Sequence, residues 1–213
     1  GQTIKINLKT YQPQYKTIIP ELLLGIGRKS NSLLDIILSI DQSGSMYTSV
    51  VYASVFGAVL ASINAVRTSM VVFDTAVVDL TELLSDPVEV LFGTQLGGGT
   101  DINKAIGYCE TLVRRPSDTI LVLISDLYEG GNTQEMLKRT ARLVALGVQI
   151  IVLLALNDEG EPSYDHHIAA QMAAMGIPSF ACTPDLFPDL MAAAINKSDI
   201  TQWAARYNVV VKK

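Results

Sequence analysis

Three apolar runs most constrain the fold of this chain: LLDIILSI at 33–40, TILVLIS at 119–125 and VQIIVLLAL at 148–156. Their interiors hold almost no polar residues, which is typical of strands that are buried on both faces. Such strands occur in parallel sheets that helices cover on both sides. The longest run has nine residues, far fewer than the roughly 20 that a membrane-spanning helix needs, so we expect no membrane span.

Segments of helical length separate these runs. Residues 102–115 place apolar side chains at three- and four-residue steps before Pro116, and residues 132–147 have Asn132 as the expected N-cap and Gly147 as the expected C-cap. Further helices are expected at 47–66, 163–176 and 185–195, and further strands at 177–183 and, closely spaced as in a hairpin, at 69–74 and 76–83. The alternation predicts an α/β fold with a doubly wound, mostly parallel central sheet, one antiparallel edge strand and helices on both faces.

The length suits one domain of ordinary size. Residues 33–196 carry the alternating pattern, whereas residues 1–32 and 197–213 lie outside it. The first of these ends contains a strand-like stretch at 3–9, and the second contains the only tryptophan, Trp203. We interpret both ends as extensions that pack on the core domain.

The composition narrows the class of partner. With a net charge of −5 and no block of Lys and Arg, the chain lacks the basic surface that phosphate backbones require, so we do not expect nucleic-acid binding. Cys109 and Cys182 lie in separate predicted elements without the spacing of metal ligands. We interpret them as buried, reduced thiols, which favours a cytoplasmic protein.

Polar residues follow the predicted strands at the points where those strands end. Asp41, Ser43 and Ser45 come directly after the first apolar run, and Asp126 comes directly after the second. Between them in the sequence, the glycine-rich stretch LGGGTD places Thr100 at the start of a predicted helix. Because ligand sites in doubly wound sheets form beyond the carboxyl ends of the strands, we expect these side chains to converge.

All of these side chains offer oxygen atoms, without an imidazole or a thiolate among them. Hard divalent cations such as Mg²⁺ prefer such ligands and usually retain several waters. Ser43 and Ser45 can both direct their hydroxyls inward if Gly44 permits the bend between them. Asp41 and Asp126 supply negative charge, and open coordination positions are left for water or for an incoming carboxylate.

The pattern D-x-S-G-S at 41–45, then Thr100 after glycines, then Asp126 at a strand end, resembles the von Willebrand factor A (VWA) domain. The resemblance covers about residues 33–195. In that family the pattern forms the metal-ion-dependent adhesion site, or MIDAS. The resemblance implies that Ser43, Ser45 and Thr100 are hydroxyl ligands. It also implies that Asp41 and Asp126 bind the metal directly or through water.

The segments DQSGSM and SDLYEGG are similar to bacterial, intracellular CoxE-like members of the family. Those proteins often work with MoxR-type AAA+ ATPases. The resemblance therefore implies a non-enzymatic adhesion or adaptor module. It would hold Mg²⁺, or alternatively Mn²⁺ or Ca²⁺, and bind an Asp or Glu of a protein partner. The residues expected at the partner-binding rim are Gln42, Gly99, Asp101, Leu127 and Glu129. Leu127 departs from the family, which often has glycine there.

A hydrolase is the alternative function. Ser43, Asp126 and His166 occur in the chain order that α/β-hydrolases use for their catalytic triads. However, Asp41 stands where the nucleophile elbow G-x-S-x-G needs glycine, and a carboxylate there does not help an attacking alkoxide. A phosphatase with Asp41 as nucleophile would need a second Asp at 43, where this chain has Ser. The stretch LGGGTD could hold a phosphate at a helix N-terminus, but it lacks the lysine of a P-loop.

Several other polar residues allow structural interpretations. His166 and His167 are adjacent, so on a helix they point about 100° apart and cannot share a metal. Asp101 is either a carboxylate stabilised by the helix N-terminus or a rim residue. Glu129 is either an ordinary loop residue or a partner contact. Asp74 and Asp79 flank the predicted hairpin, and we interpret both as solvated turn residues.

Overall fold

The computed structural model describes residues 11–12, 14, 17–18, 34–46, 66–84, 97–154, 163–181 and 185–207. The chain divides into two compact units, Gly1–Ser32 and Leu33–Lys213. In the first unit, β1 (Tyr11–Gln12) pairs antiparallel with β2 (Thr17–Ile18). The strand predicted at 3–9 lies outside the described residues, as does the helix predicted at 47–66 except for Val66, which begins a strand.

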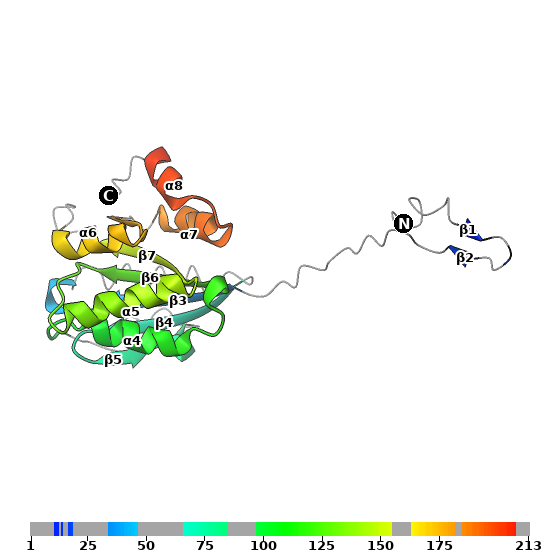
Figure 1. Ribbon diagram of the computed structural model, residues 1–213. Coiled ribbons are helices and arrows are strands. Elements are labelled where there is room, and N and C mark those ends of the chain that lie inside the picture. The colour runs from blue at the N-terminus through cyan, green and yellow to red at the C-terminus, as the bar shows by residue number, and fades with distance from the viewer. Residues whose placement is uncertain are drawn as a thin grey trace. The chain divides into compact units, whose positions relative to one another are not determined.

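In the described part of the second unit, six strands form one sheet in the order β5-β4-β3-β6-β7-β8 (Figure 1). The strands are β3 (Leu34–Asp41), β4 (Val66–Phe73), β5 (Val77–Asp79), β6 (Thr119–Ser125), β7 (Gln149–Leu154) and β8 (Ser179–Ala181). Only the edge pair β4 and β5 is antiparallel among the pairs of this sheet that the structure describes. The prediction of a mostly parallel sheet with one antiparallel edge strand is therefore confirmed. Because the strand order reverses between β3 and β6, this pair is the topological switch point.

The central strands are buried along almost their whole length, as the apolar runs predict. Every residue of β6 is buried, and β3 is buried from Asp35 to Asp41. Asp35 is the one acidic residue in the interior of the first run, and its carboxylate lies 3.7 Å from Arg67 and 3.6 Å from Arg115. These two guanidinium groups reach over the amino end of the sheet to neutralise that buried charge.

The strand predicted at 76–83 is wrong in its second half. The strand β5 ends at Asp79, and a short 3₁₀ turn, η3 (Thr81–Leu83), follows. The carboxylate of Asp79 accepts the backbone N–H of Thr81 at 2.9 Å, which closes a local turn and diverts the chain from the sheet. Asp79 also accepts the hydroxyl of Tyr108 at 2.8 Å, so it is more than a solvated turn residue.

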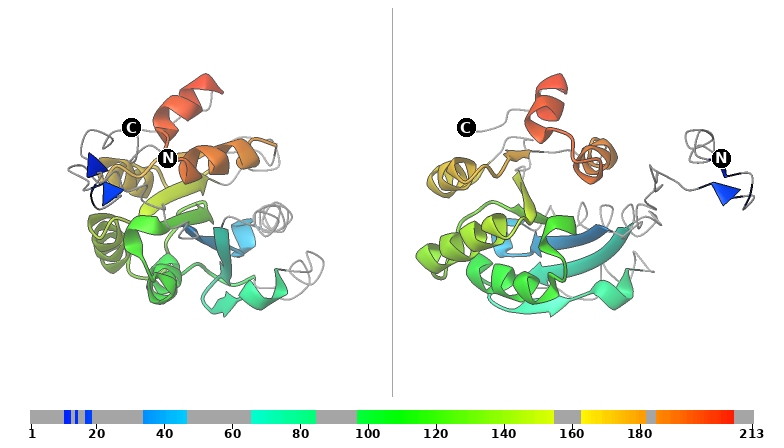
Figure 2. Two further views of the ribbon diagram at one scale, coloured as in Figure 1. Left: turned by 90° about the vertical axis from the view of Figure 1, so that its right-hand side faces the viewer. Right: turned by 45° about the vertical axis from the view of Figure 1, so that its right-hand side comes forward.

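Helices cover the two faces of the sheet with separate apolar cores. The helices α4 (Ile102–Leu112), α5 (Thr133–Ala145) and α6 (His166–Ala174) contribute to one core, and α4 and α5 lie side by side (Figure 2). On the other face, α7 (Phe187–Ile195) and α8 (Ile200–Arg206) contribute to the second core. Alternate residues of β3 enter different cores, Ile37 facing α4 and Leu38 facing α7.

The second core includes part of the C-terminal segment. Trp203 of α8 is 7% exposed, and its ring centroid lies 5.8 Å from that of Phe180 in β8. Ile200 and Ala204 are buried with it. In the first core, burial raises the pKa of the Cys109 thiol to about 12, so this cysteine is a neutral core residue. Cys182 lies outside the described residues.

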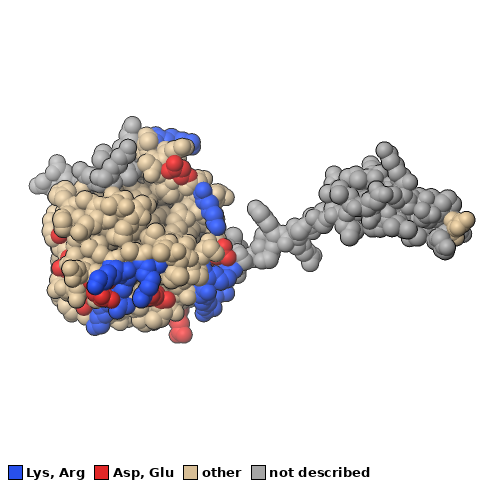
Figure 3. Space-filling model, viewed as in Figure 1, with Lys and Arg blue, Asp and Glu red and all other residues tan. Residues whose placement is uncertain are grey.

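Opposite charges are paired on the outer face of α4 and α5. Arg142 and Arg139 lie 2.6 Å and 3.5 Å from the carboxylate of Glu110, and Arg139 also lies 3.7 Å from Glu135. Figure 3 shows this group of mixed charge over the two helices. Each of these arginines has an acidic neighbour, so this face is not the single-sign basic surface that binds phosphate backbones. No helix in the described ranges combines the length and the apolar character needed to cross a membrane.

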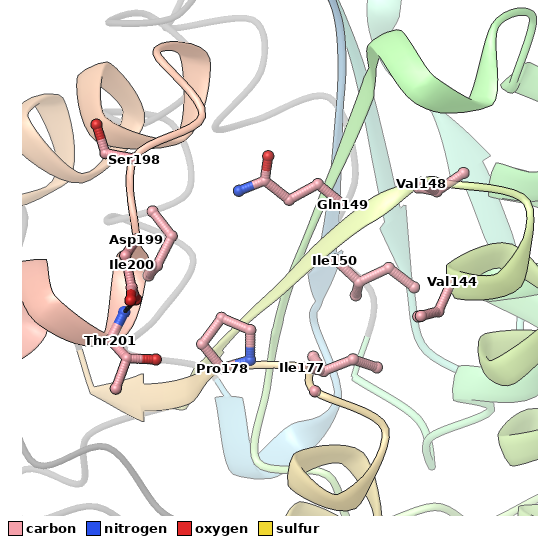
Figure 4. Close-up of a pocket in the computed structure, with 11 residues that line it drawn as sticks. Val144, Val148, Gln149, Ile150, Ile177, Pro178, Ser198, Asp199, Ile200 and Thr201 are labelled. Carbon is pink, nitrogen blue, oxygen red and sulfur yellow. Dashed lines mark hydrogen bonds between the residues drawn. The ribbon is translucent and has the colours of Figure 1, made fainter.

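A cavity of about 260 Å³ lies at the amino ends of β7 and β8 (Figure 4). Its lining mixes apolar residues such as Ile150 and Pro178 with Gln149 and Asp199. The carboxylate of Asp199 is already used, because it accepts the backbone N–H groups at the start of α8. This cavity lies at the amino ends of the strands, whereas the polar loops that the sequence singles out follow the carboxyl ends.

Caps define both ends of α5. The side chain of Asn132 accepts the N–H of Glu135 at 3.0 Å, which confirms the predicted N-cap of α5. Gly147 follows the end of α5 with φ +99°, the left-handed conformation in which glycine is favoured.

Replacing Gly147 by alanine is expected to lower the free energy of unfolding by about 1 kcal/mol, because an L side chain is strained at this φ. The new Cβ would meet only ordinary contacts, the nearest being Cα of Ser117 at 3.6 Å, so strain and not collision sets the loss. Urea unfolding measures it, with Gly147→Asn as the matched control. Asparagine tolerates this conformation better, so equal losses for the two variants would contradict the explanation.

Candidate metal centre

Asp41 is the last residue of β3, and its carboxylate is held by one donor from the turn after β3 and one from the end of β6. Oδ1 accepts the backbone N–H of Ser43 at 2.9 Å, and Oδ2 accepts the hydroxyl of Ser125 at 2.7 Å. Ser125 ends the neighbouring strand β6 and also accepts the N–H of Leu127 at 2.9 Å. Asp41 is fully buried, and its position is therefore set by the ends of both central strands.

The two predicted serine ligands lie in the turn after β3. Their hydroxyl oxygens are 3.3 Å apart, and Ser45 Oγ donates to Asp126 Oδ2 at 2.6 Å. The short 3₁₀ turn η2 (Gly44–Met46) forms this geometry, anchored by the buried side chain of Met46. Four of the five predicted metal ligands are thus brought together by β3 and β6.

The structure does not support the expectation that Gly44 is needed for the bend between Ser43 and Ser45. Among the described residues, the glycines with positive φ are Gly147 and Gly176, so the bend at Gly44 does not require glycine's conformational freedom. A Cβ at this position would meet only the carbonyl oxygen of Gly97, at an ordinary 3.8 Å. The bend follows instead from the 3₁₀ turn, in which Met46 N–H donates to the carbonyl of Ser43 at 2.9 Å.

Thr100, the fifth predicted ligand, is placed by its backbone. Its carbonyl accepts the N–H of Gly130 at 2.9 Å, from the loop after β6. Two residues earlier, the carbonyl of Gly98 accepts the N–H of Gly44 at 3.3 Å, from the loop after β3. The glycine-rich segment therefore lies against both loops that carry the other four residues.

The electrostatics of the centre favour a cation. Burial raises the pKa of Asp41 above its ordinary value, and the nearby charge of Asp126 acts in the same direction, although donors from Ser125 and Ser43 oppose both effects. Two carboxylates and neighbouring hydroxyls form an all-oxygen set, which suits a hard divalent ion. The donor set present thus fits the metal that the motif implies. The described ranges hold no group of three or more His, Cys, Asp or Glu that could bind a metal, so this centre relies on hydroxyls beside its two carboxylates.

Two of the predicted rim residues have buried side chains. Leu127 is fully buried in the core beneath α4 and α5, at φ +63°, so its side chain cannot be part of the rim as we expected. Gln42 is 4% exposed, and its N–H donates to the carbonyl of Phe73 at 2.7 Å. Gly99 is exposed. In the loop after β6, the prominent exposed side chain is instead Tyr128, which is 51% exposed and which the sequence analysis did not single out.

Asp101 and Glu129 both serve the N-terminus of α4. Asp101 is the N-cap and accepts the N–H of Lys104 at 2.8 Å, which supports the helix-terminal alternative for this residue. Glu129 accepts the N–H of Ile102 at 2.6 Å and that of Gly131 at 3.1 Å. Burial raises the pKa of Glu129, and backbone donors such as Ile102 N–H oppose this effect. These contacts tie the loop after β6 to the helix that follows Thr100.

The geometry does not assemble a catalytic triad from Ser43, Asp126 and His166. His166 is exposed at the start of α6, and its ring packs against Tyr164 with centroids 4.4 Å apart. The carboxylate of Asp126 accepts Ser45 Oγ and the N–H of Tyr128. Within the described part of the chain, no hydrogen bond joins His166 to either of the other two residues. Its neighbour His167 is exposed as well.

Two buried polar residues of this region were not identified as functional from the sequence. Ser125 is visible as a polar residue at the end of an apolar run, which is a signal that could have found it. Asp74 is only 7% exposed, so its interpretation as a solvated turn residue is wrong. Its partners include Gly97 and Gly98, more than twenty residues away, and no sequence pattern indicates that contact.

Replacing Gly130 by alanine is expected to destabilise the protein by about 1–3 kcal/mol, because the new Cβ would lie 2.7 Å from the carbonyl oxygen of Thr100. Backbone on both sides would have to shift. Gly97→Ala is the matched control, since a Cβ there would have no heavy atom within 4 Å. Urea unfolding of the two variants tests this, and equal stabilities would show that the close approach of the two loops is not required.

Comparisons with known proteins agree with this fold and motif. Residues 1–191 match the family described as VWA domain containing CoxE-like protein. The uncharacterized protein YehP of Escherichia coli (strain K12) is 37% identical over 185 residues, which are 85% of this chain and 49% of YehP. The chain thus spans about half the length of this curated relative.

Solved structures show the same fold at low sequence identity. The von Willebrand factor type A protein from Catenulispora acidiphila is 11% identical, with a TM-score of 0.56 over 76% of this chain and 42% of that one. BatB from Bacteroides thetaiotaomicron is 13% identical, with a TM-score of 0.55 over 78% of this chain and 100% of that one. Together with the family match and the arrangement of the motif, these findings identify the chain as a member of the VWA domain-containing, CoxE-like family.

Proposed function

We propose that this chain is a divalent-metal-dependent protein interaction module. The observation that carries the proposal is the contact between side-chain oxygens from the segments that directly follow β3 and β6. Ser45 Oγ lies 2.6 Å from Asp126 Oδ2 and 3.3 Å from Ser43 Oγ. Membership of the VWA family supports this class of function.

The residues that would hold the metal are Asp41, Ser43, Ser45, Thr100 and Asp126. A bound Mg²⁺, or alternatively Mn²⁺ or Ca²⁺, would supply an electrophilic position that an Asp or Glu of a partner completes. The protein's part is to keep the ligands in place before the partner arrives. Donors from Ser43 N–H and Ser125 hold Asp41, and Tyr128 N–H, at 3.2 Å, holds Asp126.

Recognition is favoured over catalysis by the chemistry of the centre. Neither an imidazole nor a thiolate contacts Ser43 among the described residues, and Ser43 itself is only 3% exposed. A hydroxyl without a base is a poor nucleophile. We therefore propose that the module is not an enzyme and that the hydrolase alternative does not apply.

The proposed partner is a protein that presents a carboxylate, and a MoxR-type AAA+ ATPase is the candidate that CoxE-like family membership suggests. The net charge of −5 and the paired charges over α4 and α5 do not favour a nucleic acid. The buried thiol Cys109 fits a reducing compartment, so we place the interaction in the cytoplasm.

A calorimetric titration with Mg²⁺ and Mn²⁺ tests the metal centre. Asp41→Ala and Ser43→Ala are each expected to weaken binding by roughly 10- to 100-fold or more, since even outer-shell partners of metal ligands have effects of this size. Asp79→Ala is the matched control, because this carboxylate contacts Thr81 and Tyr108 and not the centre. Unchanged affinity in Ser43→Ala would contradict the proposed ligand set.

A binding assay with a purified MoxR-type ATPase tests the partner. We expect complex formation in Mg²⁺ and its loss in the presence of a chelator or in Asp41→Ala, with Asp79→Ala binding as the wild type does. A complex that survives chelation would argue against metal-bridged recognition. Hydrolysis of a model ester that disappears in Ser43→Ala would favour the enzyme instead.

A further inference from the structure

Asp74 lies at the carboxyl end of β4, beside the metal centre, and has no role in the ligand set. It directly follows the last residue of β4, and its side chain is buried, at 7% exposure for the residue. Its backbone N–H donates to the carbonyl of Ala76 at 3.0 Å, and its Oδ1 accepts the N–H of Ala76 at 2.7 Å. This local turn holds the carboxylate in one orientation.

The other carboxylate oxygen reaches the glycine-rich segment before Thr100. Oδ2 accepts the N–H of Gly98 at 3.1 Å and that of Gly97 at 3.4 Å. The carbonyl of Asp74 accepts the N–H of Asp101 at 2.8 Å. Burial alone would raise the pKa of Asp74, but the surrounding backbone donors outweigh it and hold the pKa below its ordinary value. The backbone is therefore fixed on both sides of Thr100 by one residue.

The same contacts extend to the serine ligands. Gly98, which donates to Asp74, accepts the N–H of Gly44 through its carbonyl at 3.3 Å. Gly44 separates Ser43 from Ser45. Gly98 therefore links the buried carboxylate of Asp74 to the turn that carries both hydroxyls. The loop after β3 and the segment before α4 are thus held in register through Asp74.

The spacing around Gly98 gives independent support. A Cβ at Gly98 would lie 2.9 Å from Oδ2 of Asp74, closer than real Cβ atoms approach, whereas a Cβ at Gly97 would have no heavy atom within 4 Å. Asp74 cannot easily move away, because three backbone donors hold its carboxylate. The contact with Asp74 therefore explains why glycine is needed at 98 and not at 97.

We propose that Asp74 is a positioning residue of the metal centre. It fixes the backbone of residues 97–101 and, through it, the hydroxyl of Thr100, and in this way it sets the affinity for the divalent cation. The proposal rests on the proposed function, since it assigns to Asp74 the positioning of a ligand in the same site. Replacing a residue that orients metal ligands typically lowers metal affinity by about 10- to 100-fold.

A double-mutant cycle measured by titration with Mg²⁺ and Mn²⁺ tests the proposal. Asp74→Ala and Thr100→Ala are each expected to weaken binding by about tenfold or more. The double variant is expected to lose less than the sum of the two single losses, because Asp74 acts in part through Thr100. Asp74→Asn, which keeps the size and one acceptor oxygen, is expected to lose less than Asp74→Ala. Asp79→Ala is the control from the same hairpin.

A second pair of variants perturbs the same contact from the other side. Gly98→Ala is expected to weaken cation binding in the wild-type background and to have little further effect in Asp74→Ala, where the collision is removed. Gly97→Ala is the matched control and should bind the cation as the wild type does. If Asp74→Ala does not fold, this pair still decides the question, because equal affinities of the Gly98→Ala and Gly97→Ala variants would overturn the proposal.

Amide hydrogen exchange in metal-free protein supplies a readout that does not depend on binding. The N–H groups of Gly97 and Gly98 are expected to exchange faster in Asp74→Ala, with those of β6 unchanged. Failure of the wild type to bind any cation would contradict the proposed function. Normal binding by the wild type with unchanged affinity in Asp74→Ala, or effects of Asp74→Ala and Thr100→Ala that simply add, would contradict this inference alone.

Discussion

The hydrogen bond from Ser125 to Asp41 joins the two central strands at the point where the strand order reverses. It is 2.7 Å long, fully buried, and made between residues 84 positions apart. A hydrogen bond to a charged acceptor in a buried setting is worth more than one at the surface, and losing its donor would leave a desolvated charge. The centre therefore depends on the register of β3 against β6, which pairs Ile40 with Ile124 just before these two residues.

From this anchor the other loops are attached by backbone N–H groups, which donate to carbonyl and carboxylate oxygens of neighbouring segments. Gly98 lets the segment before Thr100 approach Asp74, and Gly130 lets the loop after β6 approach Thr100, in both cases at distances that a Cβ would forbid. Carboxylates then occupy the free backbone donors: Asp74 takes those of the glycine segment, and Glu129 takes that of Ile102. Acidic residues near the centre thus have two separate roles, as candidate ligands and as acceptors that hold the loops.

The main features of the fold were predictable from the sequence, as was the convergence of four of the five candidate ligands. Strand β6 spans the predicted residues 119–125 because a run without polar interruptions has few alternatives in a buried sheet. The support around the site was not predictable, because Asp74 and Asp79 have ordinary turn sequences. Asp79 ends β5 by capping a local turn, and Asp74 binds glycines on a distant segment. Only the three-dimensional approach of the loops distinguishes these two carboxylates.

Leu127 illustrates how the chain departs from the family pattern without losing the centre. A leucine at φ +63° costs roughly 1–2 kcal/mol relative to an extended or helical conformation. Full burial of a leucine side chain contributes about 2 kcal/mol, which is enough to offset that strain. The N–H of Leu127 also donates to Ser125, the residue that holds Asp41. The departure therefore exchanges backbone freedom for packing, and it directs the next residue, Tyr128, outward beside Asp126.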